Sequence, residues 1–221
     1  IDATDPTAKP YFYELNTALH HASLHGKLDA VKFLVDRGAN IELRNRGQWT
    51  PLWGAAMRRR LEVLQLLLER GADADVVDYA RDTALHLATR SGDLDLITSL
   101  LDHGADLGLA NRLGWTPIFC VPEDDPFALV FLIACGADMH ARGGEKGDTT
   151  PLLHCTNVLI WNTSTLLVEM LLLLNAEVAT SSTSGASPLL FGAQVGPLSQ
   201  EQVDATMLLL QVRDDMVMLH L

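Results

Sequence analysis

The sequence predicts an all-α solenoid of about six helix–turn–helix units with β-hairpin arms, and two motifs at one shared interval predict it. A Thr or Ser, usually followed by Pro-Leu or Ala-Leu, returns every 33 to 37 residues at Thr17, Thr50, Thr83, Thr116, Thr150 and Ser187. A Gly-Ala-Asn/Asp motif follows each of the first four threonines, 20 or 21 residues later. Two motifs that keep one interval indicate a repeat array rather than a single globule.

Each unit contains the signals of two helices. The Thr hydroxyl can cap free backbone N–H groups, and Pro is tolerated at the first helical position, so Thr50-Pro51 begins a short first helix. The second helix carries apolar residues at helical spacing, as in Leu96, Ile97 and Leu100, and ends at a glycine such as Gly104, which suits a left-handed cap. A polar, turn-rich arm leads to the next unit. Because one unit cannot bury its own apolar face, neighbouring units must stack.

The motifs Thr50-Pro-Leu52, Leu85-His-Leu-Ala88 and Arg70-Gly-Ala-Asp73 resemble ankyrin repeats. The resemblance implies L-shaped units in a curved solenoid that binds partner proteins through its hairpin tips and the concave face of its first helices. The predicted division is a linker or end of a preceding unit at 1–12, an array over 13–213 and a tail or truncated unit at 214–221. The units are expected near 13–45, 46–78, 79–111, 112–144, 145–182 and 183–213.

The later units depart from the pattern. Pro122 should shorten the first helix of the fourth unit, and Asp125-Pro126 forms a new start for its second helix. This is either a tolerated irregular unit or a break in the groove that shapes the partner. The fifth unit carries about four extra residues near 161–164, with Asn175 in place of the capping glycine, by its longer motif spacing.

Composition narrows the class of protein. Hydrophobic residues make up 48% and charged residues 20% of the 221 residues, which fits a folded chain. The net charge of −12 disfavours general binding to nucleic acid, and no apolar stretch reaches the about 20 residues that span a membrane. Three cysteines without tight spacing favour a reducing, intracellular location, cytoplasmic or nuclear. The Ile1 start favours a fragment of a longer protein.

No set of residues predicts catalysis, a cofactor or a metal. His21 and His25 have the spacing of a zinc pair but lack the intervening glutamate and a third ligand, and His20 matches the structural histidine of the repeat motif. The cysteines at 120, 135 and 155 are expected to be small buried hydrophobic residues. Gly143–Gly147 has its lysine in the wrong order for a phosphate loop. We therefore expect a protein that is not an enzyme.

Arginines and aromatic residues form the candidate partner-binding set. They are expected on the arms or at the ends of first helices, and Arg, Trp and Tyr are enriched in binding hot spots. The set is Arg44, Arg46, Trp49, Trp53, Arg58, Arg59, Arg60, Tyr79, Arg81, Arg90, Arg112 and Trp115. The alternative is that the arginines only solvate the surface and the aromatic rings staple neighbouring arms.

The sequence thus predicts a protein–protein interaction module whose partner carries an acidic surface, with no nucleic-acid or membrane partner. A basic stripe on an acidic protein would speed encounter with such a partner. The alternative function is a regulatory or targeting section of a larger protein whose catalytic or receptor domain lies outside this chain. The identity of the partner and the oligomeric state do not follow from the sequence.

Overall fold

The computed structural model describes residues 15–122, 125–144, 147 and 149–158. The chain divides into two compact units, Ile1–Arg112 and Leu113–Leu221, which are treated separately. Helices account for the regular structure of the described part, which confirms the predicted all-α class.

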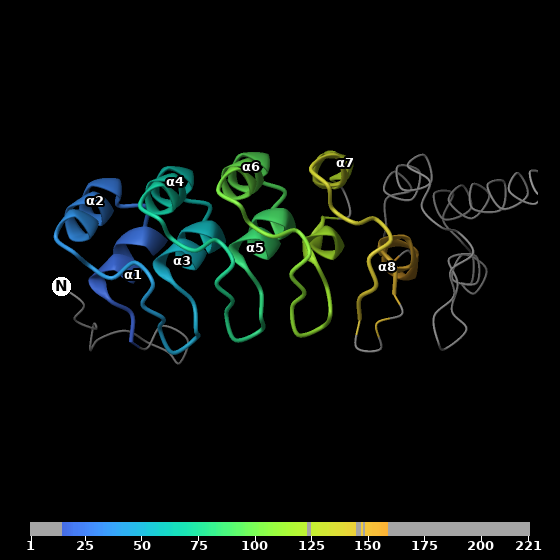
Figure 1. Cartoon of the computed structure of the whole chain (residues 1–221), viewed down its shortest axis with the longest axis horizontal. Helices are drawn as coiled ribbons and strands as arrows, with labels where there is room; N and C mark the ends of the chain where they lie inside the picture. The colour runs from blue at the N-terminus through green and yellow to red at the C-terminus, as the bar shows by residue number, and fades with distance from the viewer. Residues whose placement is uncertain (1–14, 123–124, 145–146, 148, 159–221) are drawn as a thin grey trace, which may run out of the picture. The chain divides into compact units, whose positions relative to one another are not determined.

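Unit 1 consists of three helix pairs in two rows (Figure 1). The short helices α1, α3 and α5 pack side by side, and the longer helices α2, α4 and α6 form a second row against them. Their bounds are α1 Ala18–Leu24, α2 Leu28–Asp36, α3 Pro51–Met57, α4 Leu61–Glu69, α5 Ala84–Arg90 and α6 Leu94–Asp102. This is the expected stack of helix–turn–helix repeats.

The short helices begin where the threonines predict. The side chains of Thr17, Thr50 and Thr83 each accept a hydrogen bond from the backbone N–H three residues later. This bond satisfies one of the N–H groups that a helix start leaves without a partner. The prediction that the hydroxyl caps the first helix is therefore confirmed in all three repeats of unit 1.

The longer helices share the core of unit 1 with the short ones. Val31, Val63, Leu64, Leu67, Leu96, Ile97 and Leu100 are fully buried or nearly so. Gly38, Gly71 and Gly104 follow these helices with φ between 81° and 85°, the left-handed conformation that closes a helix without steric cost when no Cβ is present. The predicted glycine caps are therefore confirmed.

The arms differ from the expected β-hairpins. In unit 1 they are tight turns closed by single backbone hydrogen bonds, such as Asn45 N–H to the Trp49 carbonyl at 3.2 Å and Asp78 N–H to the Asp82 carbonyl at 3.0 Å. No regular strand is present in the described part of the chain. Only three residues separate the paired positions, so these arms are too short for a ladder of several backbone pairs. In unit 2, Gly143 and Thr149 form an isolated antiparallel bridge.

Unit 2 shows the predicted irregularity. Its first helix is a single 3-10 turn, Pro117–Cys120, and the chain is extended at Val121 just before Pro122. The second helix, α7, spans Pro126–Ala134, and the side chain of Asp125 accepts the Ala128 N–H at 3.1 Å. Proline disfavours helical geometry in the residue before it, which shortens the first helix. Unlike its counterparts, Thr116 makes no side-chain cap.

The described part of unit 2 ends with helix α8, Pro151–Val158, where Thr150 caps the Leu153 N–H at 3.2 Å. The remainder of the fifth repeat, including the insertion near 161–164 and Asn175, lies outside the described residues, as does the sixth repeat. The proposed terminal segments 1–12 and 214–221 also lie outside them.

Candidate protein-binding surface

The candidate residues of unit 1 separate by their place in the repeat. We call Arg44, Arg46, Tyr79, Arg81 and Arg112 the tip set, because they lie on the arms. We call Arg58, Arg59 and Arg60 the turn set, because they join α3 to α4. All eight side chains are exposed, whereas Trp49 and Trp53 are buried.

Backbone hydrogen bonds tie the arms to one another. The Tyr79 N–H donates to the Gly47 carbonyl at 3.1 Å, and the Arg112 N–H donates to the Ala80 carbonyl at 2.8 Å. Arg46, Tyr79 and Arg112 each stand four residues before a motif threonine, so they occupy one position on three successive arms. The arms therefore present these three side chains as a row, held at the spacing of the repeats.

Tyr79 is the exposed aromatic side chain of this row. Its side chain is 60% exposed, and the Arg112 guanidinium carbon lies 4.8 Å from the centre of its ring. A cation over an aromatic face at this distance is attracted by the ring's quadrupole, by about 0.5–1 kcal/mol when the pair is exposed. The stack orients Arg112 on the surface and leaves its charge available to an anion.

Arg81 adopts a backbone conformation that disfavours its residue type. Its φ is 63°, and the residues at the same place in neighbouring repeats are Gln48, with φ 63°, and Gly114, with φ 74°. A left-handed conformation costs about 1 kcal/mol for a residue with a Cβ. Within the described residues the exposed Arg81 guanidinium makes no ion pair. Arg81 therefore carries a backbone cost that no ion pair among these residues offsets.

Carboxylates beneath this arm hold it in place. The Asp78 side chain accepts the N–H groups of Ala80 and Asp82 at 2.8 and 2.9 Å. The Asp82 carboxylate in turn accepts Arg90 at 3.0 Å and the Asn111 amide at 2.8 Å. Burial, followed by the neighbouring charge of Asp82, raises the pKa of Asp78 above its usual value. Arg90, a predicted contact residue, is thus engaged in supporting the arm.

Two members of the turn set make contacts that hold neighbouring repeats together. Arg59 has a φ of 54° and forms an ion pair with Asp93 at 2.9 Å. The Arg60 Nε donates to the Leu24 carbonyl at 3.4 Å, and its side chain lies against Gly26. Arg58 is the member of the turn set whose side chain forms neither an ion pair nor a hydrogen bond with the described residues.

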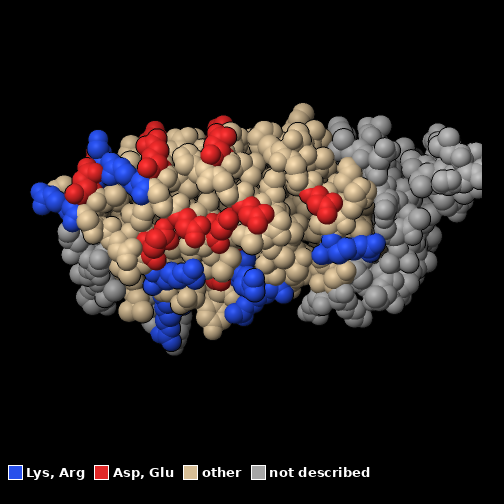
Figure 2. Space-filling model, in the orientation of Figure 1, with Lys and Arg blue, Asp and Glu red and all other residues tan. Residues whose placement is uncertain are grey.

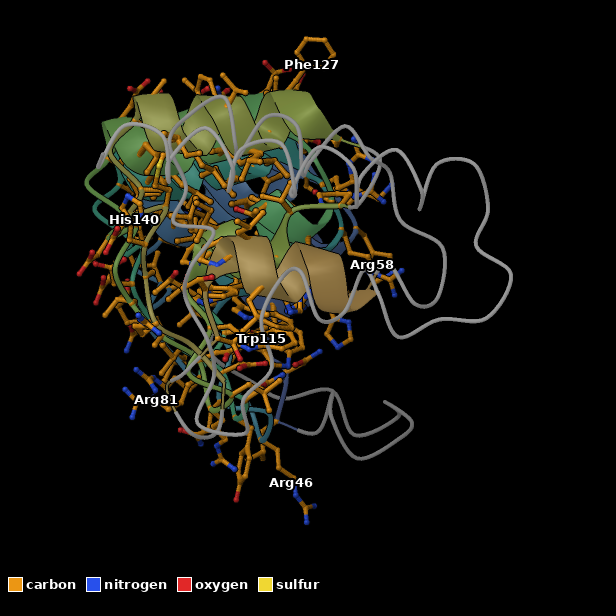
Figure 3. The ribbon with its side chains drawn as sticks, turned by 90° about the vertical axis from the view of Figure 1, so that its right-hand side faces the viewer. Arg46, Arg58, Arg81, Trp115, Phe127 and His140 are labelled. Carbon is orange, nitrogen blue, oxygen red and sulfur yellow. The ribbon has the colours of Figure 1, made fainter. Side chains whose placement is uncertain are left out.

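The turn set and the tip set do not share one face. In Figure 3, Arg58 projects to the opposite side of the ribbon from Arg81, and Arg46 lies at the end of the arms. The expectation of one continuous arginine stripe is therefore wrong for unit 1. The cause is the geometry of the unit, since the α3–α4 turn and the arm lie at different edges of each repeat.

Trp49 and Trp53 are not surface contacts, which corrects their place in the candidate set. Trp49 is 4% exposed, and both rings pack with Leu24 in a buried cluster. Their ring centres are 5.4 Å apart. A Cβ added at Gly54 would lie 2.8 Å from the Trp49 ring, so glycine is needed there for this close approach. The alternative interpretation, in which aromatic rings join neighbouring repeats, applies to both.

Trp53 takes the role of the motif histidine. The Nε2–H of His20 donates to the Trp49 carbonyl of the next repeat at 3.2 Å, and the Trp53 indole N–H donates to the corresponding Asp82 carbonyl at 3.3 Å. The Nδ1 of His20 accepts the Thr17 N–H at 3.2 Å, so the ring is neutral with its proton on Nε2. Burial lowers the pKa of His20 to about 4. The predicted structural role of His20 is confirmed.

Trp115 belongs to unit 2 and is half-buried. Its ring centre lies 4.6 Å from that of His154 and 6.4 Å from that of Phe119. Burial lowers the pKa of His154, which favours the neutral ring in this cluster. Trp115 therefore packs between the fourth and fifth repeats, consistent with the stapling alternative.

A ladder of carboxylates, which the sequence motifs alone do not predict, runs along unit 1. Glu42 accepts the Asp73 N–H of the next repeat at 2.9 Å, and Asp75 accepts the Asp106 N–H at 2.9 Å. Figure 2 shows a row of acidic atoms with basic atoms below it. The sequence signal that could have predicted this ladder is the 33-residue interval between Glu42 and Asp75, which equals the repeat length. The basic tip set therefore stands beside an acidic edge.

Other chemistry finds little support among the described side chains. There, no group of three or more His, Cys, Asp or Glu residues comes together in a way that could hold a metal ion. The His25 Nδ1 donates to the His21 carbonyl at 2.9 Å, so one ring nitrogen of that pair serves the helix end. Cys120 is buried as expected, but Cys135 is exposed. Within the same residues, no helix is both long and apolar enough to cross a membrane.

Comparisons with known proteins agree with this geometry. Residues 4–78 match a family model for ankyrin repeats in three copies, and residues 81–112 match one for a single ankyrin repeat. No curated protein sequence matches the chain.

Two solved structures are similar. One is the ankyrin repeat domain of Bcl-3, described as a unique member of the IkappaB protein family. The two sequences are 26% identical, the TM-score is 0.76, and the match covers 90% of this chain and 87% of that one. The other is an ankyrin repeat domain from Acinetobacter baumannii AYE: 24% identity, TM-score 0.77, covering 88% and 96%.

Proposed function

Because this chain is an ankyrin repeat protein, we propose that it binds a partner protein and that the tip set of unit 1 makes the contact. Ankyrin repeats are generally protein-interaction modules without catalytic activity. Arg44, Arg46, Tyr79, Arg81 and Arg112 are the residues expected to carry the interaction.

The observation that supports this surface most strongly is Arg81 in its left-handed arm. Neighbouring repeats place Gln48 and Gly114 at the same position, so the fold does not require arginine there. Backbone cost without an internal gain is typical of functional sites. Tyr79, exposed and stacked by Arg112, adds a rigid aromatic surface beside it. Together these features favour a contact site over a merely solvated edge.

The chemistry of the tip set favours an acidic partner. Arg46, Arg81 and Arg112 present guanidinium groups, which bind carboxylates in a bidentate fork. The adjacent carboxylate ladder would repel a partner that extends negative charge beyond the arms. We therefore expect a partner with an acidic patch of limited width, and an association rate that falls as the salt concentration rises.

A photo-crosslinking experiment tests this proposal. A benzophenone amino acid replaces Tyr79 in one variant and Phe33 in the other, expressed in the cells that produce the protein. Phe33 is the matched control for Tyr79, because both side chains are exposed on unit 1. Tyr79 lies on an arm and is 60% exposed, whereas Phe33 lies on a long helix and is 56% exposed. We expect a discrete crosslinked partner from position 79 only. Equal crosslinking from both positions, or none from 79, would reject the tip set.

A further inference from the structure

Helix α7 of unit 2 has an apolar face that its counterparts lack. Counted back from the glycine cap, Phe127 stands where α2, α4 and α6 carry Asp29, Glu62 and Asp95. In the same order, Val130 replaces Lys32, Gln65 and Thr98, and Ala134 replaces Asp36, Glu69 and Asp102. We call Phe127, Val130 and Ala134 the α7 face. They are three and four residues apart, so they lie on one side of the helix.

The α7 face is open in the described structure. Phe127 is 76% exposed, Val130 is 37% exposed, and Ala134 is also exposed. Phe127 points away from the ribbon (Figure 3), and α7 is free of charged atoms in Figure 2. The core of this repeat is formed by Ala128, Leu129 and Leu132, which are buried. Folding therefore does not account for the apolar residues on the outer side.

Charge around the helix limits what can cover this face. The sequence Glu123-Asp124-Asp125 precedes α7, and no basic residue occurs within it. Unit 2 as a whole has 3 basic and 12 acidic residues, a net charge of −9. A second copy would bring the same negative charge to the contact. The chain's own residues 159–221 carry one basic and six acidic side chains, which gives no complementarity either.

We propose that the α7 face docks an amphipathic helix of a partner protein whose apolar stripe is flanked by Lys or Arg. The stripe would cover Phe127 and Val130, as in other complexes where an amphipathic helix contributes apolar anchors at helical spacing. The flanking cations would complement Asp125 at the start of α7 and the net negative charge of unit 2. This surface is independent of the tip set, because it lies on another unit and takes a partner of the opposite charge.

The test uses the full chain and synthetic helical peptides of 18 residues, measured by fluorescence anisotropy. One peptide has a Leu stripe flanked by Lys, a second has the same stripe flanked by Glu, and a third has Lys with Gln in place of the stripe. We expect the Leu–Lys peptide to bind at least about tenfold more tightly than either of the others, with an affinity that falls as salt rises. Equal binding of the Leu–Glu peptide would overturn the proposed charge.

The variant F127Q/V130T gives the face the polar residue types found on the other long helices. This variant should bind the Leu–Lys peptide at least about tenfold more weakly than the natural chain does. The matched control is F33Q, which removes an exposed phenylalanine from α2 and should leave binding unchanged. Unchanged binding by F127Q/V130T, or an equal loss in F33Q, would overturn the site.

Three measurements on the same protein address other occupants. A dimer of the full chain that F127Q/V130T dissociates would assign the face to a second copy and overturn the proposal. A fall in the unfolding midpoint of more than about 2 °C in F127Q/V130T would assign it to another segment of the chain, because an exposed substitution should shift it less. Binding to phosphatidylcholine vesicles that depends on Phe127 would assign it to a membrane. None of these results is expected.

Discussion

Tyr79 and Trp49 are both aromatic residues next to an arm, yet they have opposite roles. Tyr79 lies at the tip, exposed and stacked by Arg112, whereas Trp49 is turned into the stack against Trp53. The same contrast separates Arg81, without an ion pair in the described part, from Arg59 and Arg90, which pair with Asp93 and Asp82. Position within the repeat, rather than residue type, decides which side chains can meet a partner.

The largest effect should come from the buried half of this comparison. Trp49→Ala is expected to lower the free energy of unfolding by about 3–5 kcal/mol, because it removes a large ring and leaves a cavity. Tyr79→Ala should lower it by no more than about 1 kcal/mol, which is the contribution of its contact with Arg112. Urea unfolding of both variants makes the measurement. Similar losses in the two would show that the exposed tyrosine is part of the core.

His20 extends the comparison to pH. Its folded pKa of about 4 lies below the ordinary histidine value of 6.5, so the unfolded chain takes up the proton first as the pH falls. The stabilisation is complete above about pH 6.5 and is lost between there and about pH 4, amounting to roughly 3 kcal/mol at 1.36 kcal/mol per pKa unit.

Urea unfolding at several pH values tests this for the natural chain and His20→Gln. The stability difference between the two should shrink as the pH falls through this window. Parallel pH dependences would mean that the His20 ring is not held neutral in the folded protein.

Capping gives a smaller effect with a matched pair. Thr83→Ala removes the hydroxyl that accepts the His86 N–H at 3.3 Å, and should cost about 1 kcal/mol. Thr116→Ala should cost no more than a few tenths, because Thr116 makes no side-chain cap. Thermal unfolding of the two variants measures the difference. A loss at Thr116 equal to that at Thr83 would contradict the shortened helix of the fourth repeat.

The smallest expected effect concerns the strained arm. Arg81→Gly should raise the free energy of unfolding by about 0.5–1 kcal/mol, since glycine adopts a φ of 63° without cost. Arg112→Gly, at a position without positive φ, should lower it instead. If Arg81→Gly destabilises the protein, then Arg81 has an internal contact that explains its presence.

Much of this architecture follows from the sequence because its causes are local. Each of these signals acts within a few residues. Thr17 caps an N–H three residues later, Gly71 follows an apolar helix, and Pro122 interrupts a helix, so their effects could be predicted directly. The sequence shows turn residues in the arms but not how few backbone pairs close each turn, so the arms are simpler than the predicted β-hairpins.

The site was harder to predict for a physical reason. Tryptophan is common in binding hot spots, which favours Trp53 as a contact, but its indole N–H donates to the Asp82 carbonyl in place of the motif histidine. The alignment of Thr17-Ala-Leu-His20 with Thr50-Pro-Leu-Trp53 already held that signal. Whether an arginine finds an ion pair, as Arg59 does with Asp93 34 residues away, depends on the stacking of repeats and not on local sequence.

The most direct test compares two arginines that are both exposed and both without an ion pair among the described residues, Arg81 at the tip and Arg58 at the turn. Once a partner has been captured by crosslinking, titration calorimetry gives its Kd for the natural chain, Arg81→Gln and Arg58→Gln. We predict that Arg81→Gln raises the Kd at least about tenfold and Arg58→Gln less than about twofold. The reverse order would place the contact at the turn between helices and contradict the assignment to the arms.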